Sequence, residues 1–316
     1  MSDRLTIAVV VCVYTEARWD LIAEAVASLR VQRRPADEIV LVVDHNDGLL
    51  ARLEATFAAQ PTIRVIPNAH GRGLSGGRNT GVARTTADIV AFLDDDAAAS
   101  QGWLAGLEAA YADPRVAGAG GAIDAAWATG RPRWWPPTFD WVVGCTYEGM
   151  PTTTTPVRNV IGANMSFRRT ALARTGGFVE GVGRERGRPM GGEETELSIR
   201  VTSADPDAVI LYVPAAGVRH HVPASRGRVR YFVSRCYAEG LSKATVARLV
   251  GPGRGLASER RHTVITLPSA AGRALMDAVR RRDAACAAQA VMIAIGLGVT
   301  VTGYAVGAIA GRLGRA

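Results

Sequence analysis

The chain has 316 residues, a formal net charge of +8 and a hydrophobic content of 48%. A chain of this length and composition can fill a large core, which excludes intrinsic disorder as its main state. Its four cysteines lie far apart with no metal-binding spacing, so they predict neither a disulfide framework nor a zinc site, and a reducing compartment fits best. Every basic residue except Lys243 is an arginine, and this surplus is weak support for a nucleic-acid partner, so none is expected.

The first hundred residues alternate short apolar runs with amphipathic stretches. The apolar runs at residues 5–13, 38–43, 63–66 and 88–93 predict strands, and residues 20–31 have the apolar spacing of a helix. This alternation predicts an α/β fold in which helices flank a Rossmann-like, mostly parallel central sheet.

Polar residues follow three of the predicted strands. Ligands of a parallel sheet bind beyond the carboxyl ends of its strands. The residues at those ends are Thr15 and Glu16 after the first strand, Asp44 after the second, and Asp94, Asp95 and Asp96 after the fourth. We therefore expect acids and hydroxyls from three segments to lie along one rim of the sheet.

The three adjacent aspartates repel one another, and a bound divalent cation offsets this repulsion most simply. Hard oxygen ligands suit Mg²⁺ or Mn²⁺, which proteins usually hold through one or two carboxylates together with substrate phosphates. For this segment alone, a solvated acidic turn is the alternative.

A glycine-rich segment, residues 71–76, follows the third predicted strand and matches the dinucleotide fingerprint GxGxxG. The fingerprint normally follows the first strand, whereas two strand–helix units precede it here. Because the segment matches the fingerprint, an NAD-dependent oxidoreductase is one alternative despite this unusual position. In the other interpretation, the segment delivers Arg78 and Asn79 to a nucleotide, since a guanidinium binds phosphate oxygens in a bidentate manner.

Two later regions have unusual composition. Residues 112–156 are rich in Gly, Pro and Trp, and we expect a substrate-facing region there, with Trp135 on the acceptor side. Residues 284–311 contain no charged residue and are long enough to cross a membrane. Gly303, Gly307 and Gly311 recur every fourth residue, which lets a neighbouring helix approach closely. A helix that packs on its own domain, or lies in the membrane interface, is the alternative to a spanning one.

Several motifs occur in the order and spacing of one enzyme family. They are residues 9–15 (VVVCVYT), 42–44 (VVD), 78–81 (RNTG), 92–96 (FLDDD), 162–168 (GANMSFR), 176–178 (GGF) and 192–200 (GEETELSIR). With this ordered set, the chain resembles the family 2 glycosyltransferases over about residues 5–235.

The resemblance implies a GT-A fold and the transfer of a sugar, with inversion, from a UDP-, GDP- or dTDP-sugar to an acceptor hydroxyl, with Mn²⁺ or Mg²⁺ as cofactor. The donor site it implies consists of Thr15, Glu16, Asp44, Arg78, Asn79, Asp94 and Asp95. Asp96 and His220 would hold the metal, although a structural role is the alternative for the histidine. Asn164 and Glu193 would lie on the acceptor side, and Glu194 would be the catalytic base.

Glu194 stands where the family usually has an aspartate. A glutamate can perform the same proton transfer with a side chain one methylene longer. A charged first helical turn is the alternative for this acidic segment, since acids are favoured there. A catalytically inactive binding protein at the membrane is the corresponding alternative function.

We expect a catalytic domain over residues 1–225, with a nucleotide-sugar half to about residue 112 and an acceptor half from about residue 113. An arginine-rich helical extension over residues 226–283 and a hydrophobic helix over residues 284–311 follow. Because no export signal precedes the first strand, we expect a cytoplasmic protein at the inner face of the cell membrane. A glycan or lipid-linked acceptor fits this location.

Overall fold

The computed structural model describes residues 4–181, 191–251 and 262–313. The chain divides into two compact units. The first unit consists of Met1–Asp124, Pro151–Gly187 and Glu193–His220, and the second of Ala125–Met150, Arg188–Gly192 and His221–Ala316. The long strands β6 (Val116–Trp127) and β9 (Val209–Val222) belong partly to each unit.

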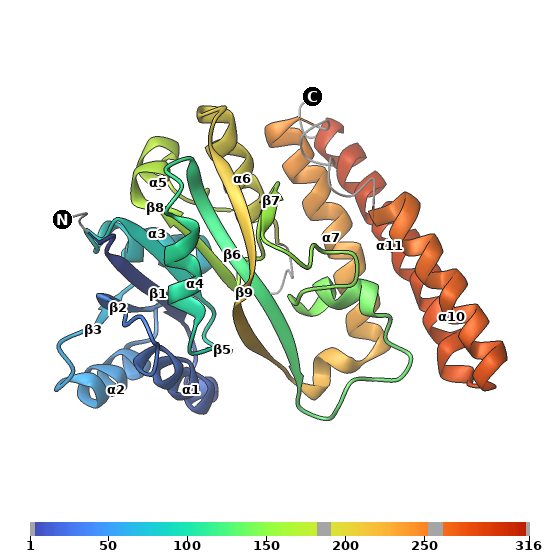
Figure 1. Cartoon of the computed structure of the whole chain (residues 1–316), viewed down its shortest axis with the longest axis horizontal. Coiled ribbons are helices and arrows are strands. Elements are labelled where there is room, and N and C mark those ends of the chain that lie inside the picture. Colours follow the sequence, from blue (N-terminus) through green and yellow to red (C-terminus); the bar gives the residue numbers. More distant parts are fainter. Residues whose placement is uncertain (1–3, 182–190, 252–261, 314–316) are drawn as a thin grey trace. The chain divides into compact units, whose positions relative to one another are not determined.

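Four parallel strands form the first half of the sheet in the first unit (Figure 1). They are β1 (Ile7–Val13), β2 (Glu38–Val43), β3 (Ile63–Pro67) and β4 (Ile89–Leu93), arranged in the order β3-β2-β1-β4. The helices α1 (Trp19–Arg30), α2 (Asp47–Phe57) and α3 (Leu74–Ala83) connect them. These elements confirm the four strands and the first helix predicted from apolar spacing.

Antiparallel strands extend this half into a mixed sheet of nine strands. β8 (Asn164–Arg168) pairs with β4, and the order continues through β6 and β9 to the short strand β5 (Ala97–Ala99), while β7 (Thr155–Val157) also pairs with β9. The helices α4 (Trp103–Ala110), α5 (Arg169–Thr175) and α6 (Glu193–Ala204) complete the unit. The α/β prediction is therefore confirmed, with an antiparallel half beside the parallel one.

Helix α3 approaches the sheet closely because two of its glycines face β1. A Cβ atom built on Gly77 would lie 3.0 Å from the Cys12 sulfur, and one on Gly81 would lie 2.5 Å from a methyl group of Val10. Any larger side chain would push the helix away from the sheet. The close approach carries Arg78, which lies between the two glycines, into the interior.

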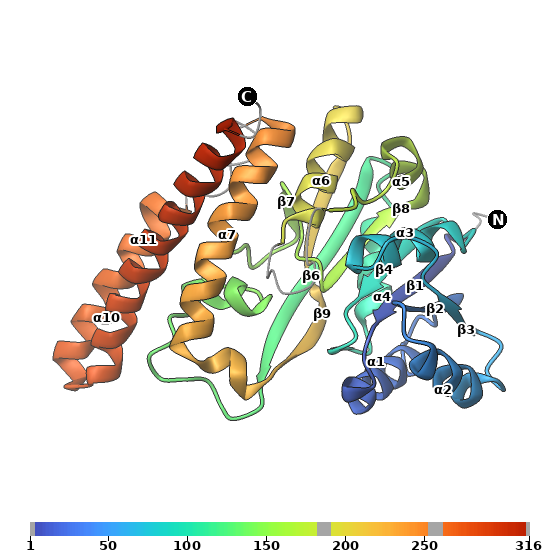
Figure 2. The same cartoon turned by 180° about the vertical axis from the view of Figure 1, so that it is seen from behind.

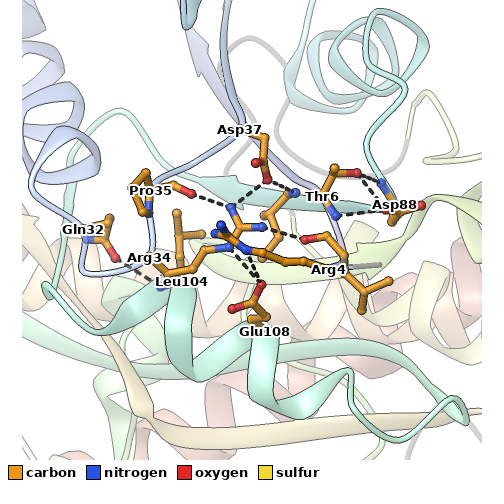
Figure 3. Close-up of polar contacts among 11 residues, drawn as sticks. Arg4, Thr6, Gln32, Arg34, Pro35, Asp37, Asp88, Leu104 and Glu108 are labelled. Atoms are coloured by element: carbon orange, nitrogen blue, oxygen red, sulfur yellow. Dashed lines mark hydrogen bonds and ion pairs between the residues drawn. The ribbon is translucent and has the colours of Figure 1, made fainter. Parts of the chain in front are cut away.

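A polar cluster joins the amino ends of β1 and β4 (Figure 3). The Asp88 carboxylate accepts hydrogen bonds from the backbone N–H (2.9 Å) and the hydroxyl (2.7 Å) of Thr6, and these bonds lower the pKa of Asp88. Asp37 accepts a hydrogen bond from the first N–H of β1 and pairs with buried Arg34 at 2.7 Å. Arg34 also donates to Glu108 of α4. This end of the sheet lies opposite the carboxyl ends of its parallel strands and is fixed by ion pairs.

The second unit is mainly helical. It contains a 3₁₀ segment η2 (Pro137–Val143), η3 (Ala224–Gly227), α7 (Val229–Val250), a π-helical turn η4 (His262–Thr266), α10 (Leu267–Arg281) and α11 (Ala284–Leu313). Its core is an aromatic cluster in which the rings of Trp127, Trp134, Trp135, Phe139 and Phe232 contact one another. The tryptophans of the Trp-rich region therefore serve to build this core.

Helix α11 runs alongside α7 and α10 (Figure 2). A Cβ on Gly303 would lie 2.2 Å from the Tyr237 carbonyl oxygen, and one on Gly307 would lie 2.9 Å from the Ala244 Cβ. The close helix approach predicted from the glycine stripe is thus confirmed, and α7 is the neighbouring helix. The segment Ala284–Gly311 of α11, with a mean hydropathy of 2.0, is long and apolar enough to cross a membrane.

Candidate functional site

The carboxyl ends of β1 and β2 bring the first predicted donor residues together. The backbone N–H of Asp44 donates to the Val13 carbonyl at 2.7 Å, which places Asp44 beside the segment that follows β1. In that segment the Thr15 hydroxyl caps a short 3₁₀ turn, η1 (Glu16–Arg18). The Glu16 carboxylate lies next to the first turn of α2, since a Cβ on Gly48 would be 2.7 Å from its Oε1. Thr15, Glu16 and Asp44 therefore share one rim of the sheet.

Asp44 also holds the glycine-rich loop in place. Its Oδ1 accepts a hydrogen bond from Asn68 Nδ2 (2.8 Å), and its Oδ2 accepts one from the Gly73 N–H (3.1 Å). His45, which the sequence analysis missed, has a positive φ of 52° and lies 2.9 Å from Asp44 Oδ1 through its Nδ1. The loop therefore packs on the carboxylate of Asp44, one of the residues of the implied donor site.

A group of ligand atoms suited to a metal ion forms at the end of β4. Carboxylate oxygens of Asp94 and Asp96 and a ring nitrogen of His220 all lie within 4.8 Å of one another. The strand register explains this arrangement, because β5 directly follows the aspartates and pairs Ala97 with His220 of β9. His220 Nε2 lies 3.1 Å from Asp96 Oδ1. Two carboxylates and an imidazole form a donor set that suits Mn²⁺, so these residues fit a divalent cation.

Arg18 is a second residue that the sequence analysis missed. Its Nη1 lies 2.5 Å from Asp95 Oδ1 and 3.2 Å from Asp96 Oδ2. Burial raises the pKa of Asp95 to about 7, against the opposing effect of Arg18. The position of Arg18 just beyond β1, on the predicted rim, was the available signal. The positive charge of Arg18 therefore offsets part of the repulsion between Asp95 and Asp96.

Arg78 connects the acids after β4 to helix α6. Its side chain is 2% exposed. Nη1 lies 3.1 Å from Glu193 Oε1, and Nη2 lies 3.5 Å from Asp94 Oδ1 and donates to the Gly162 carbonyl at 3.1 Å. Burial lowers the pKa of Arg78, but the charged neighbours together, Glu193 first, outweigh burial, so that the pKa is raised. Both of its guanidinium NH₂ groups thus engage protein groups.

Glu193 and Glu194 begin helix α6, in a turn where acids are favoured. Glu193 is 7% exposed, and among the described residues its Oε2 has no hydrogen-bond partner. Glu194 is partly exposed and lies beside Gly162, since a Cβ on that glycine would be 3.8 Å from Glu194 Oε2 and 3.2 Å from Arg78 Nη2. The predicted base therefore lies near the arginine that contacts Asp94.

Three other predicted site residues are engaged in structural contacts. Asn164 is fully buried, accepts a hydrogen bond from the Trp103 indole (2.7 Å), and donates to carbonyls of β6 and β9. Asn79 exchanges two 2.8 Å hydrogen bonds with the backbone of Phe178 and so fixes the turn after α5. Trp135 is fully buried in the aromatic cluster and donates to Asp140. Because a buried ring presents no face to a sugar, we do not retain Trp135 as an acceptor contact.

Comparisons with known proteins identify the family of this chain. The family model described as Glycosyl transferase family 2 matches residues 8–176 of the chain. The glucosyl-dolichyl phosphate glucuronosyltransferase of Haloferax volcanii is 31% identical over 240 residues, 76% of each chain. The pre-mycofactocin glycosyltransferase of Mycobacterium tuberculosis is 38% identical over 78 residues, 25% of this chain and 17% of that one.

Two solved structures show the same fold. The mannosyltransferase PcManGT from Pyrobaculum calidifontis, in complex with GDP-Man and Mn²⁺, superposes with a TM-score of 0.60 at 20% identity, covering 99% of this chain and 88% of that chain. GalNAc-T7 with UDP, GalNAc and Mn²⁺ gives a TM-score of 0.56 at 18% identity, covering 76% and 48% respectively.

The chain belongs to glycosyl transferase family 2 and has a GT-A-like fold. It is a glycosyltransferase (EC 2.4) that transfers a sugar from a nucleotide sugar.

Proposed function

We propose that this glycosyltransferase moves a sugar, with inversion, from a UDP-, GDP- or dTDP-sugar to a hydroxyl of a lipid-linked glycan acceptor at the cytoplasmic face of a membrane. The observation that carries the proposal is the link through Arg78. This side chain lies between Asp94, one of the three grouped metal-type ligands, and the acidic start of α6. Arg78 therefore links the acids proposed for the donor side to the acids proposed for the acceptor side.

On the donor side, Asp44 receives hydrogen bonds from the base, and Thr15 and Glu16 line the nucleoside pocket. Asp96 and His220, with Asp94, hold a divalent cation. When bound, the cation supplies the positive charge that stabilises the departing diphosphate. Arg78 keeps Asp94 in place, and Arg18, which pairs with both Asp95 and Asp96, keeps Asp96 in place.

On the acceptor side, Glu194 removes the proton from the acceptor oxygen as this oxygen attacks the anomeric carbon. The bond from that carbon to the diphosphate breaks on the opposite face, and the diphosphate leaves with its electron pair. Glu193 cannot readily play this role, because its Oε1 is paired with Arg78 inside the protein. Glu194, which is partly exposed, is the acid of this turn that can meet a substrate.

Two observations support a lipid-linked acceptor. The Haloferax volcanii relative is named for action on glucosyl-dolichyl phosphate. The described part of this chain ends in the long apolar helix α11. An enzyme that acts on a soluble sugar acceptor would not need such a helix.

Turnover of the variants Glu194→Gln and Asp96→Asn tests the assignment of roles. With Mn²⁺ and a panel of nucleotide sugars, both variants should lose at least about 10²-fold in sugar transfer, whereas Glu194→Gln should still bind the donor. The matched control is Glu54→Gln, an exposed acid on α2, which should keep full activity. Wild-type turnover in both site variants would contradict the assignment.

Thermal shift measurements test the ligand class without turnover. Stabilisation by UDP, GDP or dTDP together with Mn²⁺ supports the nucleotide-sugar site. Stabilisation by NAD alone would contradict the proposed nucleotide-sugar site. Donor binding with no transfer to any acceptor would favour an inactive binding protein.

A further inference from the structure

Helix α11 exposes one continuous apolar stripe to solvent. Its exposed large side chains are Val291, Ile295, Val301, Val306 and Ile309, between 39% and 57% exposed. They recur at helical spacing and therefore lie on one face of the helix. At 1.5 Å per residue, the stripe is about 27 Å long. No charged residue interrupts it.

Helix α10 adds a second apolar stripe with a basic border. Leu275 and Met276 are just over half exposed, and Val279 is 80% exposed. Arg273 and Arg280, seven residues apart, lie beside this stripe, and residues 280–282 are all arginines at the turn before α11. A helix with an apolar face and arginines at its border is typical of segments that lie in a membrane interface.

The opposite face of α11 is closed by α7, so a spanning α11 would have to take α7 with it into the bilayer or separate from it. The two helices run parallel: Gly296 meets Phe232, Gly303 meets Tyr237, and Gly311 meets Arg248. Contacts this close leave no space for lipid between the helices.

Charged residues of α7 lie at the level of the middle of α11. Lys243 Nζ is 3.1 Å from Glu239 Oε1, and Glu239 is adjacent to Gly240, which packs against Thr300 and Gly303. If α11 crossed the bilayer with α7 attached, this ion pair would lie in the hydrocarbon core, where charges are expensive. If α11 left α7 behind, the glycine-packed interface would be lost.

We propose that α10 and α11 bind the surface of an anionic bilayer with their helix axes in the plane of the interface, and that α11 does not cross the membrane. The apolar stripes enter the boundary between headgroups and acyl chains, and the arginines of α10 and of residues 280–282 contact lipid phosphates. This inference rests on the membrane attachment in the proposed function and replaces a spanning anchor with a surface one. In this position α11 keeps its packing against α7.

Flotation of the full chain with lipid vesicles tests the surface. Wild-type protein should bind vesicles of three parts phosphatidylcholine to one part phosphatidylglycerol more tightly than pure phosphatidylcholine. The double variant Leu275→Glu/Val279→Glu should lose at least about tenfold in partitioning, since each side chain leaves apolar surroundings. Each of Arg280→Gln and Arg281→Gln should lose about fivefold on the anionic vesicles alone.

Val31→Glu, an exposed apolar residue of the first unit, is the matched control and should bind vesicles like wild type. Failure of the wild-type chain to bind anionic vesicles overturns the proposal, as does unchanged binding of the double variant.

Depth measurements distinguish a surface helix from a spanning one. Nitroxides are attached to Val291→Cys, Ile295→Cys, Val301→Cys and Ile309→Cys in a Cys12→Ser/Cys286→Ser background, and their accessibility to oxygen and to a nickel chelate is measured in vesicles. In the interface, all four labels should lie at one shallow depth, about 5–10 Å below the headgroups. A spanning α11 would instead put Ile295 and Val301 near the bilayer centre and Ile309 near its far side, and this result refutes the proposal.

The two proposals can fail separately. Donor hydrolysis by Leu275→Glu/Val279→Glu should stay at the wild-type level, because neither residue belongs to the sheet rim. Loss of vesicle binding with intact hydrolysis supports the surface role. Wild-type turnover of Glu194→Gln would refute the catalytic assignment and leave the vesicle results unaffected.

Discussion

Replacing Arg78 with methionine removes a positive charge from a side chain that is 2% exposed, while most of its length is kept. The substitution leaves the Glu193 carboxylate buried without its partner, and Glu193 Oε2 already has no hydrogen-bond partner among the described residues. Breaking a buried ion pair by removing one member destabilises a protein by about 3–5 kcal/mol. For a unit of roughly 200 residues, a loss of this size lowers the melting temperature by about 10 °C.

Urea unfolding of Arg78→Met, Glu193→Gln and the double variant, at neutral pH, measures this effect as a double-mutant cycle. We expect the double variant to be more stable than the sum of the single changes predicts, by about 1–3 kcal/mol, because it no longer buries an unpaired carboxylate. Arg174→Met is the matched control. Its pair with Asp205, at 3.2 Å, is half-exposed on the arginine side, and such pairs contribute less than about 1 kcal/mol.

The reasoning about Arg78 is refuted if Arg78→Met unfolds at the same urea concentration as Arg174→Met. It is also refuted if the coupling in the cycle stays below about 0.5 kcal/mol, the value expected for independent sites. Arg78→Lys separates charge from geometry. An ammonium group keeps the charge but cannot contact Glu193 and the Gly162 carbonyl through a planar fork, so we expect intermediate stability.

Three further predictions concern other contacts. Arg18→Gln removes a cation that competes for Asp96, so titration calorimetry should show several-fold tighter Mn²⁺ binding, and weaker binding would contradict this role. Hydrogen bonds from Thr6 lower the pKa of Asp88 in the folded state. The ionised Asp88 therefore stabilises the fold fully above its unfolded pKa, about 4, and this stabilisation is lost as the pH falls through the lower folded pKa. In thermal unfolding, Asp88→Asn should be less stable than wild type at pH 7, with a smaller difference at pH 3. Gly303→Val places a side chain against the α7 backbone and should lower the melting temperature measured by calorimetry, whereas Gly298→Val, where a Cβ meets no described atom within 4 Å, should not.

The grouping of polar residues at the carboxyl edge of the sheet could be predicted from the sequence because its causes are local. Apolar runs of five to seven residues specify β1, β2 and β4, and parallel pairing brings their carboxyl ends to one edge. The acids directly after those strands must therefore lie near one another. The GT-A-like fold and the grouping of Asp94 with Asp96 follow from the same pattern.

The partners of the rim residues could not be predicted, since they depend on tertiary register and burial. The local sequence does not bring His220 to Asp96, because their contact depends on the register in which β5 and β9 pair; only the family resemblance pointed to it. Asn164 occupies a motif position, yet the structure buries it between strands, where its amide satisfies backbone carbonyls. For Trp135, the sequence shows an aromatic residue but not the three aromatic rings that contact it in the buried cluster.

The two arginines beside the acids differ in a way that bears on ligand exchange. The Arg78 side chain is almost inaccessible and is held by groups from three segments, so a donor cannot displace it without exposing Glu193. The Arg18 side chain is 21% exposed, lies on a short 3₁₀ turn, and contacts Asp95 and Asp96. If a divalent cation were held by Asp96, it would replace the charge of Arg18 there, and we expect Arg18 then to turn toward the donor phosphates while Arg78 stays in place. This asymmetry lets one arginine act as a fixed link within the site and the other as an exchangeable counter-charge.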